Sequence, residues 1–482
     1  MKSERVFDYS PRLKPLPHQL EATQFLIERN NAALFDEQGL GKTKIMIDAL
    51  AQNFALGNIE AAIVICKKSL LATWQAEIAK HSLLKSIVLR GTQKQKGLSY
   101  MWFAHFYLIN YELVSSEVDR LRRFLLTRSM AIVLDESQRI KNPEGKATQA
   151  ILSISSAAKR RYIITGTPIA NSPRDLWAQA FFLDGGIALG RTIGDFCERF
   201  HIEHKANVHT ILDESSLKEL RGALSQFSMR RLKDDVLELP AKTYKAIQVE
   251  LEPLQREMYD RLRSQLYLEI VNLDGQQVID DSENILKRLL RLVQISSNPK
   301  LVDESYAAVP AKFIELDSLV TDMLARHEKL IVWTGFVENV RLLRRRYEQH
   351  GAAMIYGGVP IQSRQEIVER FQNSRELKIL IANPAAAREG ITLTAANHAI
   401  YLDRNFNLVD YLQSQDRIHR IGQDKPSYIY SLVGNDTIDA YIEDVVYRKQ
   451  LIAQYIYRDN QQLNLPPVEY TKQDILRLLG AS

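Results

Sequence analysis

The chain has 482 residues, of which 45% are hydrophobic and 25% charged, and its formal net charge at pH 7 is +5. This length exceeds what a single hydrophobic core organises, so we expect roughly two to four domains. The two cysteines, Cys66 and Cys197, lie far apart, which argues against a disulfide framework or a cysteine zinc site and indicates a reducing compartment. The positive charge permits contact with a polyanion without requiring it.

The sequence shows neither a signal peptide nor a membrane span. Residues 1–5 lack an apolar core, and no apolar run approaches the length that crosses a bilayer. We therefore expect no membrane contact. The expected location is the cytoplasm of a microbial or virus-infected cell, or the nucleus if the source is eukaryotic.

An amphipathic helix is predicted over residues 18–27, after a lead that contains several prolines. Gln19 lies at the start of this helix, where its amide can offer both a donor and an acceptor to the edge of an adenine base. A single glutamine on a helix is usually only solvated. Gln19 therefore indicates a nucleotide site only together with other motifs.

A glycine-rich turn follows, between a predicted strand and a predicted helix. Gly39 and Gly41 allow backbone N–H groups to wrap an anion. Lys42 comes next and can neutralise phosphate oxygens, and the hydroxyl of Thr43 suits Mg²⁺. These four residues predict a phosphate-binding loop.

The surroundings of this turn are those of a phosphate loop. Residues 31–35 have the composition of a short buried strand, and residues 44–50 have helical spacing, so a phosphate would lie at a helix N-terminus. In the strict form of the loop, glycine stands where this chain has Asp36. For this stretch alone, a chance glycine turn before a helix stays the alternative.

A second buried strand is predicted over residues 61–66, which form a continuous apolar run with β-branched side chains. Lys67 and Ser69 follow it directly. A cation and a hydroxyl at this place suit a nucleic-acid backbone, whereas a solvated loop is the alternative when these residues are taken alone.

Two adjacent acids, Asp135 and Glu136, follow the apolar residues 130–134. They would lie at the carboxyl end of a strand, where open α/β sheets place their ligands. One carboxylate can hold the Mg²⁺ that bridges nucleotide phosphates, and its neighbour can orient the attacking water or accept its proton. Acid pairs are common on surfaces, but a pair after a buried strand in a chain with a phosphate loop favours a nucleotide site.

A further strand, residues 161–164, ends in a hydroxyl-rich turn. At this point the chain resembles the SNF-type (switch/sucrose non-fermenting) branch of the superfamily two helicase-like ATPases, over about residues 11–460. The matching segments are Gln19, residues 36–43 (motif I), 135–138 (motif II), 165–172 (motif III) and 229–240, which closes the first lobe in that family.

A second series of short apolar strands begins near residue 330 and alternates with helical stretches, which predicts another parallel sheet. Residues 413–423 are similar to motif VI of the family. Arg417 and Arg420 are spaced i,i+3, so a helix would present both to one anionic group, such as a transferring phosphoryl. When these two arginines are considered without the rest of the motif, a surface arginine pair is the alternative. The resemblance adds Gln413 to the catalytic group.

The fold implied by the resemblance is α/β, with two tandem RecA-like parallel-sheet lobes and helical protrusions between them. Lobe 1 is expected over residues 1–240, with a helical insertion at about 185–235. Lobe 2 is expected over residues 241–482, with a helical protrusion at about 250–300 and C-terminal helices. In such a protein the hydrolytic site is complete only when the lobes close around ATP.

The resemblance also implies contacts with DNA. Candidate residues are Lys67, Ser69 and Asn110 in lobe 1, and Thr392 and Thr394 of a motif V in lobe 2. Because backbone contacts carry little sequence information, we expect salt-sensitive binding to double-stranded DNA without sequence preference.

Three departures from the family pattern concern the motifs, and one of them is that Cys66 and Lys67 lack the proline common after the first strand of motif Ia. Gln138 stands where the family usually has histidine, which puts the link between motif II and motif III in question. Residues 385–390 replace a glycine-richer start of motif V, which leaves open how closely this loop approaches a backbone.

The function expected from all of this is ATP hydrolysis with Mg²⁺, coupled to translocation on double-stranded DNA by a monomer that remodels protein–DNA complexes or DNA structures. Forked or branched DNA is a further candidate substrate, and the sequence names no protein partner. A fork-remodelling or annealing enzyme and a strand-separating helicase are alternatives within the class. An ATP-locked DNA-binding subunit is an alternative of another class, against which the intact ATP motifs argue.

Overall fold

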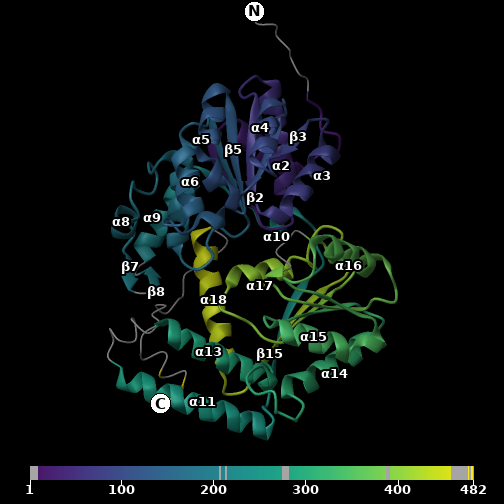
Figure 1. Ribbon diagram of the computed structural model, residues 1–482. Helices are drawn as coiled ribbons and strands as arrows, with labels where there is room; N and C mark the ends of the chain where they lie inside the picture. Colours follow the sequence, from purple (N-terminus) through teal and green to yellow (C-terminus); the bar gives the residue numbers. More distant parts are fainter. Residues whose placement is uncertain are drawn as a thin grey trace, which may run out of the picture. The chain divides into compact units, whose positions relative to one another are not determined.

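We describe the protein from a computed structural model, which describes residues 9–205, 208–211, 214–273, 282–386, 391–457, 476 and 479–480. The chain groups into two compact units, each built around its own sheet (Figure 1). Unit 1 comprises Met1–Glu203, Ile211–Glu238 and Ala453–Leu463, and unit 2 comprises His204–Thr210, Leu239–Ile452 and Asn464–Ser482. The chain thus passes from unit 1 to unit 2 between Glu238 and Leu239.

Unit 1 contains a seven-stranded sheet in the order β3-β4-β2-β5-β6-β1-β9, in which every pairing is parallel. Its strands are β1 (Asn31–Leu34), β2 (Ala61–Cys66), β3 (Ser86–Val88), β4 (Phe106–Asn110), β5 (Met130–Asp135), β6 (Arg160–Ile164) and β9 (Ser228–Met229). β2 and β5 are buried along their whole length, as expected for apolar runs covered on both faces. The carboxyl ends of all seven strands meet at one edge of the sheet.

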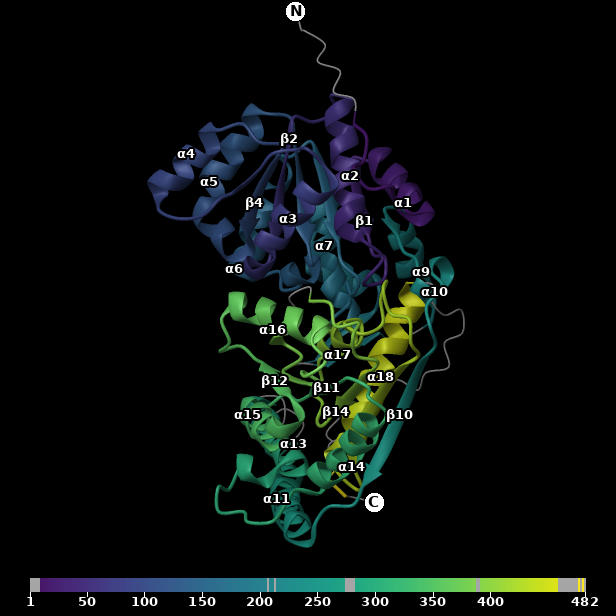
Figure 2. The same cartoon turned by 90° about the vertical axis from the view of Figure 1, so that its right-hand side faces the viewer.

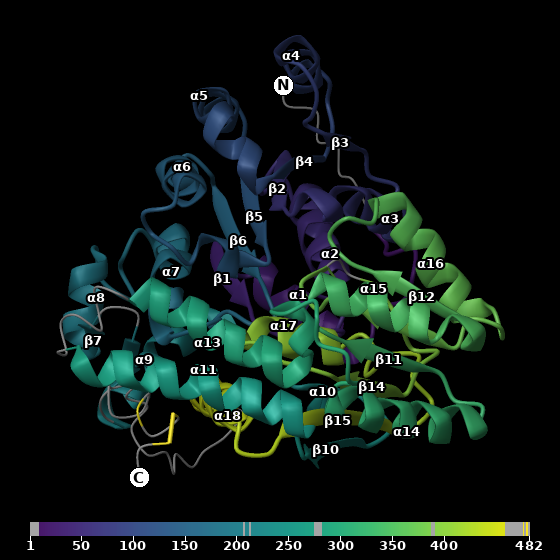
Figure 3. The same cartoon turned by 60° about the horizontal axis from the view of Figure 1, so that its bottom comes forward.

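Two groups of helices cover this sheet. The helices of unit 1 are α1 (Pro17–Ile27), α2 (Lys42–Ala55), α3 (Leu71–His81), α4 (Gln93–Met101), α5 (Tyr111–Thr127), α6 (Lys146–Ser155), α7 (Trp177–Asp184), α8 (Ile193–Arg199), α9 (Glu214–Ser225) and α10 (Lys233–Val236). α1, α2 and α3 pack together over one face, and α5, α6 and α7 pack together over the other (Figure 3). Every second residue of the central strands faces α1–α3 and forms one core with them.

The interval predicted as a helical insertion, about residues 185–235, contains α8 and α9 but is not helical throughout. A two-stranded sheet of β7 (Ile202–Lys205) and β8 (Val208–Ile211) lies between these helices. The sequence over 202–211 is mostly polar, so neither strand shows the apolar alternation that identifies a half-buried strand.

Unit 2 contains a six-stranded sheet in the order β10-β15-β14-β11-β13-β12, again with parallel pairing throughout. Its strands are β10 (Lys242–Val249), β11 (Leu330–Trp333), β12 (Ala352–Ile355), β13 (Ile379–Ala382), β14 (His398–Tyr401) and β15 (Ser427–Gly434). β10 is a long strand at the edge of the sheet (Figure 2).

The helices of unit 2 form three groups. They are α11 (Pro253–Asn272), α13 (Ser282–Ser297), α14 (Ala311–Ala325), α15 (Val337–Arg346), α16 (Ile361–Asn373), α17 (Leu408–Gln415) and α18 (Ile438–Ile456), whose last residues group with unit 1. α14 and α15 pack on one face of the sheet, and Phe371 of α16 packs on the other. α11 and α13 lie side by side and share a separate apolar core with α18 (Figure 3). α11 and α13 occupy the interval for which a helical protrusion is predicted.

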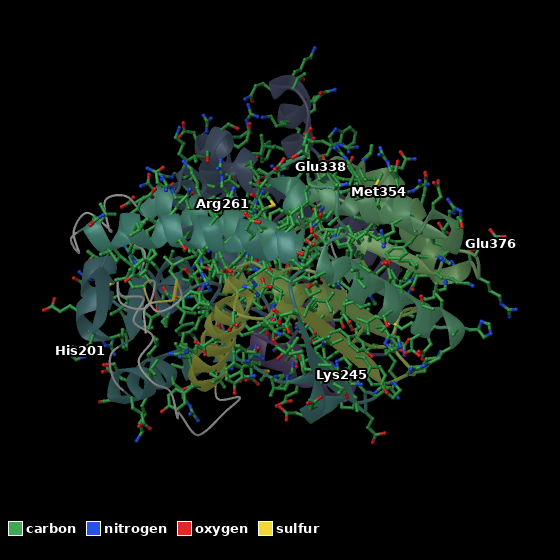
Figure 4. All side chains as sticks on the ribbon, turned by 90° about the horizontal axis from the view of Figure 1, so that it is seen from below. His201, Lys245, Arg261, Glu338, Met354 and Glu376 are labelled. Carbon is green, nitrogen blue, oxygen red and sulfur yellow. The ribbon has the colours of Figure 1, made fainter. Side chains whose placement is uncertain are left out.

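The exposed edge of the unit 2 sheet carries positive charge. Lys245 on β10, labelled in Figure 4, holds its ammonium group 5.6 and 5.8 Å from the ring centroids of Tyr428 and Tyr430 on β15. Charged side chains at a sheet edge disfavour pairing with another chain. This edge is therefore protected against such pairing.

The predicted fold class, α/β with two tandem parallel-sheet lobes, is confirmed by the two sheets. None of the helices in the part of the chain that the structure describes has the length and apolar character needed to cross a membrane.

Candidate active site

The glycine-rich turn forms a loop between β1 and α2. Gly39 and Gly41 have φ of +91° and +84°, a region that residues with a side chain rarely adopt. Gly41 also lies against α1, because a Cβ at this position would collide with Nε2 of Gln19. α2 begins at Lys42, the next residue, so the N–H groups of its first turn border the loop. This is the backbone arrangement that binds phosphate.

Lys42 lies over the loop that precedes it. Its Nζ donates to the carbonyl oxygens of Asp36 and Glu37, at 2.8 and 3.1 Å. The turn after β6 approaches the same place, because a Cβ on Gly166 would lie 2.7 Å from Cγ of Gln38 and 3.3 Å from Nζ of Lys42. The phosphate loop and the turn predicted as motif III therefore lie together.

Gln19 is buried against the phosphate loop rather than solvated. Its Nε2 donates to the carbonyl of Leu40 at 3.3 Å, and its Oε1 accepts from the backbone N–H of Leu16 at 3.0 Å. The first turn of α1 is thereby fixed against the loop. Its reading of adenine stays a prediction.

An ion pair explains why aspartate stands where the strict loop has glycine. Asp36 is fully buried, and its carboxylate accepts two hydrogen bonds from the guanidinium of Arg231, one from Nε at 3.1 Å and one from the Nη2 group. The backbone of the same segment continues the pairing of β9 with β1: Phe35 N–H donates to Met229 and Glu37 N–H to Arg231, at 2.8 and 3.0 Å. The start of the phosphate loop is thus held by a segment far along the chain.

Replacing Arg231 with methionine should leave Asp36 as a buried carboxylate without its partner. We expect a loss of stability of about 3–5 kcal/mol, measured by urea unfolding. The double variant Asp36→Asn, Arg231→Met should recover most of this loss. Arg199→Met is the matched control, because the Arg199–Glu219 pair is solvent-exposed and should cost at most about 1 kcal/mol. An equal loss in both methionine variants would contradict this account.

Asp135 lies at the carboxyl end of β5, on the face that α3 covers. Ala131, Val133 and Asp135 alternate along the strand, and the first two belong to the core that includes Trp74. The indole Nε1 of Trp74 donates to Oδ2 of Asp135 at 2.8 Å. The hydroxyl of Tyr111 donates to the main-chain carbonyl of Asp135, also at 2.8 Å. Two aromatic side chains from different helices therefore fix this residue.

Burial raises the pKa of Asp135 to about 6, and the negative charge of Glu136 acts in the same direction. The hydrogen bond from Trp74 and the positive charges of Lys42 and Lys67 act in the opposite direction. A buried carboxylate with a half-buried one beside it fits a divalent cation, which prefers oxygen ligands. In the part of the chain that the structure describes, no cluster of three or more acidic, histidine or cysteine side chains could hold a metal ion alone. The binding of Mg²⁺ by Asp135 and Thr43 stays a prediction.

The raised pKa predicts that Asp135→Asn stabilises the protein in EDTA. The folded protein holds the proton of Asp135 more tightly than the unfolded chain, so its stability falls as pH rises from about 4 to about 6. The gain from asparagine should therefore be absent below pH 4 and complete above pH 6, where we expect the midpoint of thermal unfolding to rise by a few degrees. Asp119→Asn, a change at the exposed surface, is the control. A pH-independent difference would contradict the prediction.

Glu136 has a left-handed backbone conformation, with φ of +55° and ψ of +54°. Such a conformation is costly for a residue with a side chain and is common at functional sites. Gln138 supports it: its Nε2 donates to Oε2 of Glu136 at 2.6 Å, and its Oε1 accepts from the hydroxyl of Thr165 at 2.7 Å. Gln138 therefore links motif II to motif III, although it stands where the family usually has histidine.

Gln138→Leu should remove both of these hydrogen bonds while keeping a side chain of similar size. We expect the kcat of ATP hydrolysis to fall by about 10²-fold because Glu136 loses its orientation. The KM for ATP should change little. Gln138→His, which restores the residue usual in the family, should regain part of the activity. An unchanged kcat for Gln138→Leu would show that the link to Thr165 has no part in catalysis.

The three candidate DNA-contacting residues of unit 1 lie at the carboxyl ends of neighbouring strands. Lys67 and Ser69 follow β2, and Asn110 ends β4, where it lies opposite Cys66 in the parallel register. Asn110 donates to Oε2 of Glu112 at 2.8 Å. The structure thus brings these residues together along one edge of the sheet, and their contact with DNA stays a prediction.

The arginines of motif VI are not on a helix, contrary to the prediction. α17 ends at Gln415, residues 416–418 form a turn, and residues 419–420 form a bend. The carbonyl of Arg417 accepts from the N–H of Leu393 at 2.9 Å instead of a helical N–H, and its side chain reaches the carbonyl of Ile391 at 3.4 Å. Arg417 is buried and Arg420 is half-buried, so the two do not share a helical face.

Motifs V and VI nevertheless adjoin each other in unit 2. Gln423 donates to the carbonyls of Thr394 and Ala396, at 3.2 and 2.9 Å. Thr394 also accepts from Nε2 of Gln372 at 3.2 Å, Thr392 is half-buried, and Gln413 is buried on α17. Residues 387–390, the first part of the predicted motif V, lie outside the described residues.

Sequence reasoning missed Trp74, Tyr111 and Arg231 as parts of the site. Each is separated from its partner by a long stretch of chain. Trp74 and Tyr111 also belong to residue types that do not indicate phosphate or metal chemistry. Only Arg231 could have been found from the sequence, because it lies in residues 229–240, the segment that resembles the family.

Comparisons with known proteins agree with the family resemblance seen in the sequence motifs. A family model described as SNF2-related domain matches residues 18–301, and one described as helicase conserved C-terminal domain matches residues 311–422. The putative ATP-dependent helicase/translocase YwqA of Bacillus subtilis is 28% identical over 94% of this chain and 49% of its own length. An uncharacterized ATP-dependent helicase of Mycoplasma pneumoniae is 28% identical over 99% of this chain and 45% of its own length.

Eukaryotic proteins are also among the relatives. Chromodomain-helicase-DNA-binding protein 1-like of Mus musculus is 26% identical over 90% of this chain and 48% of its own length. The chain spans about half the length of the curated relatives it matches. Among solved structures, the Sulfolobus solfataricus SWI2/SNF2 ATPase core in complex with double-stranded DNA is 25% identical with a TM-score of 0.45, covering 99% of this chain and 100% of that one.

Proposed function

Because the chain belongs to the SNF2-related family of ATP-dependent helicases, we propose that it is a DNA-dependent ATPase that couples ATP hydrolysis to translocation on double-stranded DNA. One observation carries the proposal: the phosphate loop, the acid pair and the turn of motif III lie together in unit 1. Lys42 lies over the loop near Gly166, and Gln138 joins Glu136 to Thr165.

In the proposed reaction, the N–H groups around Gly39 and Gly41 and the ammonium of Lys42 bind the ATP phosphates. Bound Mg²⁺, held by Thr43 and Asp135, would neutralise charge that develops on the phosphates. Glu136, fixed by Gln138, orients the attacking water and accepts its proton. The catalytic roles proposed for Gln413, Arg417 and Arg420 rest on their match to motif VI.

Double-stranded DNA is the proposed partner, contacted by Lys67, Ser69 and Asn110 in unit 1 and by Thr392 and Thr394 in unit 2. Hydroxyl, amide and ammonium groups bind phosphate and sugar rather than base edges, so binding should be independent of sequence and should weaken steeply with salt. We propose that the protein acts as a monomer and that its translocation on DNA remodels protein–DNA complexes or forked DNA.

Displacement of a triplex-forming strand from duplex DNA tests translocation directly. We expect the protein to displace this strand in the presence of ATP and Mg²⁺, because movement along the duplex strips what lies in its path. Lys42→Ala should abolish displacement, since the phosphates lose their cation. Lys94→Ala, which removes an exposed lysine of α4, should leave the rate unchanged.

Two parallel substrates separate the alternatives. Conversion of a synthetic fork without displacement of the third strand would favour a fork-remodelling enzyme. Unwinding of a partial duplex into single strands would favour a strand-separating helicase. Either result, without triplex displacement, would contradict the translocase proposal.

A further inference from the structure

The two segments proposed to contact DNA in unit 1 each run directly into a helix that reaches Asp135. Lys67 and Ser69 lead into α3, which carries Trp74, and Asn110 leads into α5, whose first residue is Tyr111. Both aromatic side chains donate a hydrogen bond to Asp135, the residue proposed to hold Mg²⁺. The two donors come from different helices and reach different parts of the same residue.

Trp74 acts on the carboxylate itself. Its side chain is only 1% exposed, and its Nε1 lies 2.8 Å from Oδ2 of Asp135. A hydrogen bond to a charged oxygen is among the stronger kinds and fixes direction as well as distance. The ammonium of Lys67, from the segment that precedes α3, also acts on this carboxylate. A shift of the segment that carries Lys67 would therefore change two interactions of the Asp135 carboxylate: the one with the charge of Lys67 and the hydrogen bond from Trp74.

Tyr111 acts on the main chain of the same residue. Its hydroxyl lies 2.8 Å from the carbonyl oxygen of Asp135, and its ring is 2% exposed. Tyr111 directly follows Asn110, so a movement of that residue on DNA would move the helix end that bears the hydroxyl. The side chain and the main chain of Asp135 are thus fixed by two separate DNA-contacting segments.

The burial of a tryptophan does not by itself require that its indole N–H have a hydrogen-bond acceptor. Trp333, on β11 of unit 2, is fully buried, and its Nε1 has no hydrogen-bond partner among the residues that the structure describes. A buried tryptophan in this protein is therefore tolerated without an acceptor. The placement of Trp74 against a carboxylate at the ATP site is a specific feature of unit 1.

We propose that Trp74 and Tyr111 are positioning residues that couple DNA binding to the affinity of the ATP site for Mg²⁺-bound nucleotide, by fixing Asp135 from the two segments that contact DNA. The inference rests on the proposed function, because it requires that Lys67, Ser69 and Asn110 meet DNA. By thermodynamic linkage, the factor by which DNA tightens nucleotide binding equals the factor by which nucleotide tightens DNA binding.

The test measures this coupling factor rather than turnover. The affinity for a fluorescent, non-hydrolysable ATP analogue is measured with Mg²⁺, with and without saturating duplex DNA, and the affinity for labelled duplex is measured with and without the analogue. For the unaltered protein we expect a factor of about 5 to 150 in both directions. Trp74→Phe keeps the ring packing and removes the donor, and it should bring the factor close to one. Tyr111→Phe should also reduce the coupling factor.

Two matched controls separate coupling from loss of a buried polar group. Trp333→Phe removes an indole N–H that has no acceptor, and Tyr162→Phe removes a buried hydroxyl that bonds the carbonyls of Leu26 and Arg29. Both should leave the coupling factor unchanged. In EDTA, the analogue should bind Trp74→Phe and the unaltered protein equally, because the effect requires a cation at Asp135.

The outcomes distinguish the inference from the proposed function. If the unaltered protein binds duplex DNA and shows coupling while Trp74→Phe and Tyr111→Phe keep the full factor, the inference is wrong and the proposed function stands. An equal loss of analogue binding with and without DNA would assign Trp74 a purely structural role and also overturn the inference. If the unaltered protein does not bind duplex DNA, the proposed function fails, and the inference fails with it.

Discussion

The buried carboxylate of Asp135 sets the constraint on which the site in unit 1 depends. An ionised carboxylate beside a second acid, away from water, requires hydrogen-bond donors and positive charge. The chain supplies both from separate elements: the indole of Trp74 from α3 donates to the carboxylate, and the positive charge of Lys42 from the phosphate loop acts on it. The hydroxyl of Tyr111 from α5 fixes the main-chain carbonyl of the same residue. These contacts place the elements that flank β5 around one point, which is also where the proposed metal–nucleotide complex would bind.

A second buried carboxylate, Asp36, fixes the other side of the nucleotide site. Its partner Arg231 is 195 residues away in sequence, and β9 pairs with β1 immediately before it. The phosphate loop therefore reaches its final form only when the segment after the insertion has joined the sheet. The Asp36–Arg231 ion pair thus joins the start of the phosphate loop to the segment that follows β9.

The local features of the site could be predicted from sequence, whereas its long-range partners could not. The phosphate loop and the acid pair follow from short patterns, because a strand, a special turn and a helix occur in succession. The pairs Asp36–Arg231 and Trp74–Asp135 depend on which strands become neighbours, which periodicity does not specify. The i,i+3 spacing of Arg417 and Arg420 predicts a shared helical face, but α17 ends at Gln415 and the carbonyl of Arg417 accepts from the N–H of Leu393.

Steady-state ATP hydrolysis tests the central claim most directly, measured without nucleic acid and with single-stranded DNA, duplex DNA or RNA. The account predicts slow turnover alone and strong stimulation by duplex DNA, which falls as salt increases. Lys42→Ala, which lacks the phosphate-binding cation, should show neither the slow turnover nor the stimulation. Absence of turnover with every nucleic acid, together with retained ATP binding, would contradict the account and identify the protein as a nucleotide-dependent binding subunit.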